Sequence, residues 1–375
     1  MSRKIILLLG LLLVLITSLQ SFNVYILMLF SLATYFFIPI NKGWDKITIC
    51  LFIFSLLYSA NIYFSGNVAS YANLICYLIT PVAFYRLGKY LTNNTDENNL
   101  KTSILIFALI YSLPLYMMTM QGIASEGIVN VTRMLDSDSD KNMAATLYGL
   151  HASIGLGCVG VFFHYKSLKI LDVICAACLV VGSLLTVIHL VNRTGLVILV
   201  AVLVVLFLYK GKEKFFQTLI IVCFTTIVIS YIFSAGIVDI DIIDAYSARE
   251  ETIGYESKTL GGRSEIWDIA ISNLFTEIWG WEGGYAHNLW LDIARVSGIF
   301  ALIPFLIATV IFWCKCIKLF ARKYISCATA ILLGLNISII LSSLVEPIIE
   351  GSLLYFSVTM LMWGITYSHL TRKKC

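Results

Sequence analysis

The stretch ILDVICAACLVVGSLLTVIHLVNRTGLVILVAVLVVLFLY, residues 170–209, decides the fold class. It contains two apolar runs, Ile170–Leu190 and Gly195–Tyr209, which are joined by a tight connection with the sequence Val-Asn-Arg-Thr. Apolar helices of this kind can cross a bilayer core of about 30 Å. The apolar residues are continuous and do not alternate with polar ones, which excludes barrel strands. The stretch therefore predicts two membrane-spanning helices.

Similar runs recur along the whole chain of 375 residues, which is 59% hydrophobic and only 13% charged. Its mean hydropathy is +0.89. A soluble domain carries about twice that charged fraction. We therefore expect a single polytopic, all-α membrane domain over residues 1–375, with about 12 transmembrane helices. Besides the two runs above, the expected spans are Ile5–Leu19, Phe22–Ile40, Ile47–Phe64, Ala72–Lys89, Thr102–Met120, Met143–His164, Phe215–Phe233, Asn288–Trp313, Ile325–Leu344 and Ser352–Ser368.

The orientation of these spans follows from the basic residues, which concentrate on the cytoplasmic side of membrane proteins. With the amino terminus inside, 19 of the 26 basic residues lie on the inner side and 17 of the 22 acidic residues on the outer side. We expect both termini to be cytoplasmic. The net charge of +4 is then a signal of orientation and does not indicate nucleic-acid binding.

Two outer loops are long, residues 121–142 and residues 234–287, and loops of this length usually carry function. In the second loop, Ser264–Ile278 has apolar residues at spacings of three and four, which predicts an amphipathic helix. Four tryptophans lie in or near this helix, and they favour a position along the membrane–water boundary. Stacking of these tryptophans on sugar rings is the alternative.

Basic residues concentrate on the cytoplasmic side of membrane proteins, so an arginine on the outer side is unusual and suggests a specific role. Arg193 lies in the tight connection, Arg263 at the start of the amphipathic helix, and Arg133 in the first outer loop. A guanidinium near the amino terminus of a helix is suited to phosphate. We expect Arg193 and Arg263 to bind a diphosphate. For Arg133, pairing with a carboxylate or a lipid headgroup is equally compatible with the sequence.

His287 lies at the outer mouth of the tenth span, directly before Asn288, a residue that favours the N-cap position and that we also expect to bind substrate. The helix dipole there favours a neutral imidazole, the form that accepts a proton. General-base catalysis on a sugar hydroxyl is therefore expected, and a capping or interface histidine is the alternative. His189 precedes Arg193 by four residues and shares its neighbourhood.

Asp292 and Arg295 lie within the tenth span, on the same helix face as Asn288. Charges at this depth must face protein or a water-filled cavity. The two residues either neutralise each other or support the site. Glu346 and Glu350, in the last outer turn, are secondary candidates for a cavity wall.

The acidic run Asp136-Ser-Asp-Ser-Asp140 resembles a metal loop, but Lys141 and Leu147 occupy the positions where an EF-hand needs glycine and glutamate. A sugar-transferase metal motif needs only two spaced aspartates and so stays open. A solvated acidic turn is the favoured interpretation, and we expect no metal and no cofactor.

Three landmarks resemble the superfamily of Wzy O-antigen polymerases and O-antigen ligases, which are bacterial membrane glycosyltransferases. They are Asn192-Arg-Thr-Gly195, Gly262-Arg-Ser-Glu-Ile-Trp267 and His287-Asn-Leu-Trp-Leu291 followed by Gly298. The resemblance covers roughly residues 130–310. The chain departs from the family pattern at Asn192, where serine is common, and in the short Gly280–Gly284 stretch before the histidine.

The resemblance implies a GT-C-like fold in the bacterial inner membrane and a glycan donor linked to undecaprenyl diphosphate. It assigns proton abstraction to His287, and neutralisation of the diphosphate to Arg193 and Arg263, with Arg133 as a further contributor. It also implies a chain-length regulator protein as a partner, besides membrane lipid. The small outer insert favours a polymerase. The alternatives are a ligase that uses lipid A core as acceptor and, in a different class, a 12-helix repeat-unit flippase.

Overall fold

The computed structural model describes residues 3–20, 23–38, 44–66, 69–93, 95–127, 145–210, 263–320 and 326–371. Every regular element within these ranges is a helix, as the sequence predicted. Helices lie at 11 of the 12 expected spans, and the remaining one, Phe215–Phe233, lies outside the described residues. Five described helices are long and apolar enough to cross a membrane: Lys46–Phe64, Glu97–Ser125, Ile170–His189, Leu289–Lys318 and Cys327–Val345.

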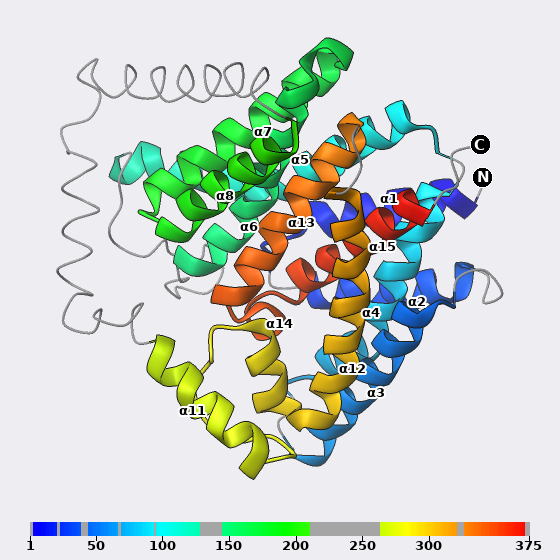
Figure 1. The fold of residues 1–375 in the computed structure, drawn as a ribbon, viewed down its shortest axis with the longest axis vertical. Helices are drawn as coiled ribbons and strands as arrows, with labels where there is room; N and C mark the ends of the chain where they lie inside the picture. The colour runs from blue at the N-terminus through cyan, green and yellow to red at the C-terminus, as the bar shows by residue number, and fades with distance from the viewer. Residues whose placement is uncertain are drawn as a thin grey trace. The chain divides into compact units, whose positions relative to one another are not determined.

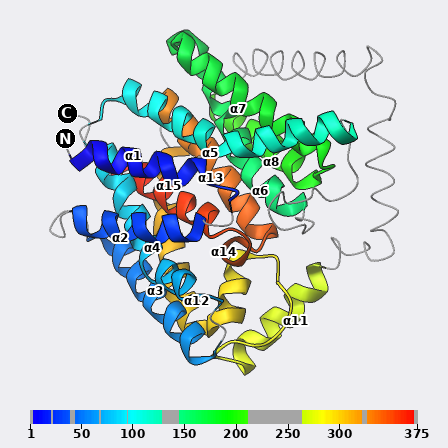
Figure 2. The same cartoon turned by 180° about the vertical axis from the view of Figure 1, so that it is seen from behind.

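The chain forms two compact units (Figures 1 and 2). Unit 1 comprises residues 1–96, 262–324 and 343–375, and unit 2 comprises residues 97–261 and 325–342. The helices of unit 1 are α1 (Arg3–Ile16), α2 (Asn23–Phe37), α3 (Lys46–Phe64), α4 (Tyr71–Thr92), α11 (Arg263–Thr276), α12 (Leu289–Phe320), α14 (Ile348–Gly351) and α15 (Leu353–Thr371). Those of unit 2 are α5 (Glu97–Glu126), α6 (Ala145–Gly157), the 3-10 helix η1 (Cys158–Ser167), α7 (Ile170–His189), α8 (Arg193–Lys210) and most of α13 (Cys327–Val345).

The core of unit 1 is formed by α4 packed against α15 and α3 packed against α12. Two glycines let the backbones of α4 and α15 meet. A Cβ atom on Gly88 would lie 2.2 Å from the carbonyl oxygen of Leu361, and one on Gly364 would lie 2.0 Å from that of Tyr85. Small residues at helix crossings allow this close approach, so a larger side chain at either position would push the two helices apart.

Side-chain caps begin several helices, because the first N–H groups of a helix have no partner inside it. Asp45 accepts a hydrogen bond from the Thr48 N–H at 2.8 Å and so begins α3. Ser70 accepts one from the Asn73 N–H at 3.1 Å and begins α4. These caps fix where the two helices start. The carboxyl-terminal end of α3 and the first turns of α4 also line a pocket.

In unit 2, α5 and α6 both pack against α7. A buried ion pair joins the starts of α5 and α7: Lys101 Nζ lies 2.8 Å from Asp172 Oδ2. The Thr102 hydroxyl donates to Asp172 Oδ1 at 2.7 Å. Removing one partner of such a pair would leave a buried charge uncompensated, which costs several kcal/mol. The pair therefore fixes α5 against α7.

The described parts of the two long outer loops both contain helix. Residues 121–126 of the first loop continue α5, and residues 128–142 lie outside the described part of the chain. In the second loop, residues 263–276 form α11 at the place where an amphipathic helix was expected, whereas residues 234–262 lie outside the described ranges. Several apolar side chains of α11, among them Ile269 and Phe275, are exposed.

Candidate functional site

The segment that leads from α11 to His287 is fixed against a kink in α12. Gly298 has φ +71°, a left-handed conformation, and a Cβ atom there would lie 2.1 Å from the carbonyl oxygen of Ile278. The same carbonyl accepts a hydrogen bond from the Ile299 N–H at 3.1 Å, and the Arg295 carbonyl accepts one from the Trp281 N–H at 2.9 Å. Only glycine fits this close approach. The glycine that ends the His287 motif therefore allows the preceding loop to pack onto the helix.

His287 itself has a left-handed backbone with φ +51°. This conformation is rare for a residue with a side chain and costs about 1–3 kcal/mol. The Asp292 carboxylate holds it in place, because Oδ1 accepts a hydrogen bond from the Ala286 N–H at 2.7 Å and Oδ2 one from the Asn288 N–H at 3.1 Å. The Trp267 indole also donates to the Ala286 carbonyl at 2.8 Å. One aspartate thus clamps the backbone on both sides of the histidine.

Asn288 caps α12, as expected. Its Oδ1 accepts hydrogen bonds from the N–H groups of Trp290 at 3.1 Å and Leu291 at 3.2 Å. Its Nδ2 donates to the Leu344 carbonyl at 3.3 Å and so links the cap to the end of α13. The asparagine therefore fixes the start of α12 and holds this helix start close to the turn that carries Glu346.

The imidazole of His287 is half-buried, and its Nδ1 atom is buried without a hydrogen bond to any described residue. Burial lowers the pKa of this histidine, and the positive charge of Arg263 lowers it further, while Asp292 acts in the opposite direction. The neutral form therefore predominates at pH 7. The helix dipole predicts this neutral form from the sequence, whereas in the structure burial is the main cause of the lowered pKa.

Arg263 begins α11 and faces Glu346, with Nη2 and Oε1 3.7 Å apart. Glu346 is only 3% exposed, and its Oε2 atom makes no hydrogen bond to a described residue. Burial raises the pKa of Glu346 to about 7 against the opposing effect of Arg263. Near neutral pH the carboxyl group is thus incompletely ionised, which leaves Arg263 with positive charge for an anionic ligand. We call His287, Arg263, Glu346 and Asp292 the His287 cluster.

Arg295 extends this arrangement to a second carboxylate. Its Nε atom lies 3.5 Å from Asp292 Oδ1, and its Nη2 atom forms an ion pair with Glu350. Nη1 donates to the Gly283 carbonyl at 3.2 Å, and the guanidinium lies 5.6 Å from the centre of the Tyr285 ring. Of the two interpretations of the Asp292–Arg295 pair, the geometry supports both: the charges neutralise each other, and they hold the loop around His287.

No protein-family model and no curated protein matches this sequence. The resemblance to the polymerase and ligase superfamily therefore rests on the three motifs alone. Two of these motifs, at Arg263 and at His287, lie together in unit 1, where α11 packs against α12.

The third motif belongs to unit 2. Arg193 is the first residue of α8 and is exposed, and His189 is the buried last residue of α7. Asn192 accepts a hydrogen bond from the Gly195 N–H at 3.0 Å, so the asparagine that departs from the family pattern acts as the cap of α8. The structure thus brings together His287, Asn288, Asp292, Arg295 and Arg263. Arg133 and the acidic run Asp136–Asp140 lie outside the described residues.

The sequence did not reveal three contacts that shape the cluster: the clamp by Asp292, the ion pair between Arg263 and Glu346, and the bond from Trp267 to the histidine loop. The available signals were an aspartate in the first turn after a His-Asn pair and two glutamates in a short outer turn between apolar runs. Among the described residues, no group of three histidine, cysteine, aspartate or glutamate side chains is placed to hold a metal ion.

Proposed function

We propose that this chain is a membrane glycosyltransferase that moves a glycan from undecaprenyl diphosphate to a hydroxyl of another lipid-linked repeat unit. The reaction would take place on the periplasmic face of a bacterial inner membrane. The observation that carries the proposal is the His287 cluster, in which a neutral imidazole, whose Nδ1 atom makes no hydrogen bond to a described residue, is held beside an arginine at a helix start. The substrate class, a glycan linked to undecaprenyl diphosphate, comes from the resemblance of the three motifs to the polymerase and ligase superfamily.

The chemistry follows from the groups in the cluster. His287 removes the proton from the acceptor hydroxyl, whose oxygen forms a bond to the anomeric carbon of the donor sugar. The bond from that carbon to the phosphate oxygen breaks, and its electron pair leaves with the lipid diphosphate. Arg263 neutralises this leaving group, with Arg193 and Arg133 as further contributors. A guanidinium suits the task because it is permanently charged and contacts two phosphate oxygens at once.

Reconstitution tests the proposal. The purified full chain is placed in lipid vesicles with an undecaprenyl-diphosphate-linked repeat unit, and the products are separated by length. The proposal predicts polymers of the repeat unit. Transfer only to added lipid A core would assign a ligase instead. Movement of the lipid-linked repeat across the bilayer without formation of a new glycosidic bond would assign a flippase and contradict the proposal.

Fixed arginines supply the positive charge in this mechanism, so we predict that elongation does not need a divalent cation. The same vesicles should elongate the repeat at an unchanged rate after treatment with EDTA. Complete loss of elongation, restored by magnesium or manganese, would instead assign a role to the Asp136–Asp140 run.

A further inference from the structure

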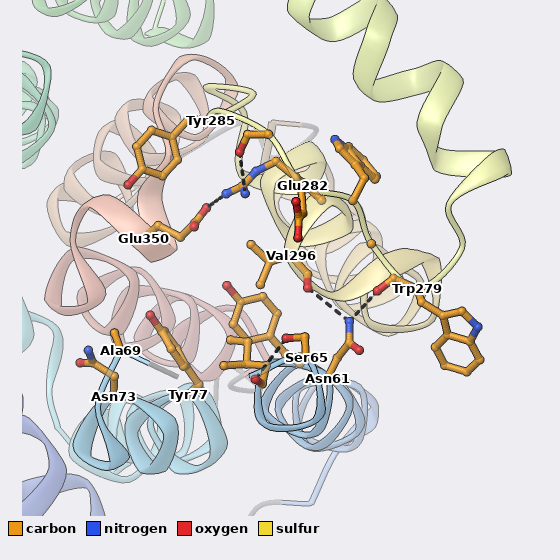
Figure 3. A pocket seen from close by; sticks show the side chains of 16 residues that line it. Asn61, Ser65, Ala69, Asn73, Tyr77, Trp279, Glu282, Tyr285, Val296 and Glu350 are labelled. Carbon is orange, nitrogen blue, oxygen red and sulfur yellow. Dashed lines mark hydrogen bonds and ion pairs between the residues drawn. The ribbon is translucent and has the colours of Figure 1, made fainter. Parts of the chain in front are cut away.

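Unit 1 contains a pocket of about 620 Å³ beside the His287 cluster (Figure 3). The carboxyl-terminal end of α3, the first turns of α4 and the loop before His287 form its walls, together with Arg295 and Glu350. Sites for small molecules commonly measure about 300–1,000 Å³. The pocket is therefore large enough for a ligand of the size of one or two sugar rings.

The charges of the pocket disfavour an anion. Among the described residues that line the pocket, the one guanidinium is that of Arg295, and it is compensated by the ion pair with Glu350 and by Asp292 at 3.5 Å. Glu282, whose side chain is exposed at the rim, adds a further negative charge to the lining. A phosphate or an acidic sugar would therefore meet a carboxylate, and no described lining residue supplies an uncompensated cation to neutralise it. The diphosphate-binding role thus stays with Arg263 and does not extend into the pocket.

The remaining lining combines aromatic rings with neutral hydrogen-bonding groups. Tyr58 and Tyr77 pack nearly perpendicular to each other, with ring centres 5.3 Å apart. The hydroxyl groups of both tyrosines and the side-chain amide of Asn73 make no hydrogen bond to another described residue. Trp281 also lines this space, whereas the Trp279 indole packs on Phe300, with ring centres 4.8 Å apart, and points away from the pocket in Figure 3. A sugar ring has one face of C–H groups, which packs on aromatic rings, and hydroxyl groups at its edge, which bond to such polar groups.

Tyr285 belongs to the pocket lining and its ring contacts His287, which is not itself a lining residue. The Tyr285 ring lines the pocket, and its centre lies 6.3 Å from that of the His287 imidazole. Figure 3 shows Tyr77, Tyr285 and Glu350 around the same open space. We propose that the pocket holds an uncharged sugar ring of the acceptor, presents its hydroxyl toward His287, and rejects acidic sugars. The assignment to the acceptor rests on the function proposed above, whereas the preference for an uncharged sugar rests on the lining alone.

Saturation-transfer NMR on the full chain in nanodiscs tests the pocket without any donor. The probes are methyl glycosides of glucose, galactose and N-acetylglucosamine, with methyl glucuronide as the acidic counterpart. We expect transfer to at least one neutral glycoside and none to the glucuronide. Tyr77→Phe, which keeps the ring and removes one hydrogen-bonding group, should weaken binding about 2- to 12-fold, and Trp281→Ala should abolish it. Tyr71→Phe, on an exposed tyrosine of α4 outside the pocket, is the matched control and should bind like the wild type.

Any one of three results would overturn the proposal. The first is equal transfer to the glucuronide, the second is no transfer to any neutral glycoside, and the third is wild-type binding by both pocket variants. The outcome is separable from that of the proposed function. Elongation without sugar binding would contradict only the proposed sugar pocket. Sugar binding without elongation would contradict the proposed transferase, and with it the assignment of the pocket to the acceptor, but not the preference for an uncharged sugar.

Discussion

Two turns of this protein share an unusual local structure and differ in what holds it. Val191 in unit 2 has φ +50° and His287 in unit 1 has φ +51°, and each directly precedes an asparagine that caps the next helix. Backbone groups hold the Val191 turn: the Asn192 N–H donates to the Val187 carbonyl at 2.8 Å, and the Val191 N–H donates to the Ile188 carbonyl at 3.0 Å. A buried carboxylate, Asp292, holds the His287 turn.

The difference is consistent with a structural role for the Val191 turn and with the catalytic role that we propose for the His287 turn. Val191 is completely buried, so the strained residue there serves the connection between α7 and α8. His287 is half-buried and keeps a ring nitrogen that no described residue engages. Strain of this kind persists only where the surroundings enforce it, and it concentrates at functional sites. The open hydrogen-bonding capacity of the imidazole and the carboxylate that holds its backbone support the catalytic role proposed for His287.

The largest expected effect comes from removing the histidine. His287→Ala should lower the elongation rate about 10²- to 10⁴-fold, the usual contribution of a general base. Donor binding should stay close to wild type, because Arg263 and not His287 contacts the diphosphate in our mechanism. Elongation and binding of the lipid-linked repeat are measured in the same vesicles at equal protein levels. A wild-type elongation rate would remove His287 from the mechanism.

Removing the clamp should have a smaller effect on rate and an added effect on stability. Asp292→Ala leaves the N–H groups of Ala286 and Asn288 without acceptors, at about 1–3 kcal/mol each. The histidine would then leave its position, which we expect to slow elongation about 10²-fold. Thermal unfolding in detergent and elongation per folded protein check both effects. Asp292→Asn keeps one acceptor oxygen, so its stability and elongation rate should lie between those of the wild type and the alanine variant. If the alanine variant equals the wild type in both measurements, Asp292 does not hold the His287 turn.

The smallest expected effect compares the two caps. Asn192→Ala and Asn288→Ala should each lower the free energy of unfolding by about 0.5–2 kcal/mol, the usual cost of losing an N-cap. Asn288→Asp restores the acceptor but lacks the amide that donates to Leu344, so it should recover only part of the loss. Denaturation by urea measures these differences. No change for either alanine variant would show that the caps do not stabilise α8 and α12.

Much of the fold could be predicted from the sequence, because apolar length is a strong signal for a membrane helix. Each of the expected spans that falls in the described ranges coincides with a helix, and α11 begins at Arg263, where the amphipathic pattern begins. The division into two units was not predicted, since it depends on which helices pack together and not on the composition of any one helix.

The sequence could name the residues of the candidate site but not the contacts between them. His287, Asn288 and Arg263 were visible because a polar residue in an apolar chain is rare. The clamp by Asp292 was hidden, because its partners are backbone N–H groups that every residue carries. The pocket was hidden as well: Tyr58 and Tyr77 lie in apolar runs, and only the packing of α3 and α4 shows that their rings face the loop before His287.

The pH dependence of elongation tests the central claim that neutral His287 accepts the proton. Its pKa is lowered below 6.5, so the base form is present at pH 7 and is lost as the pH falls through that pKa. Glu346, with a pKa of about 7, adds a separate inflection that Glu346→Gln should remove. In the Glu346→Gln background we predict that kcat/KM is constant above pH 7, falls through a single pKa below 6.5, and loses this acidic limb when His287→Ala is added. The same acidic limb in both proteins would contradict the account.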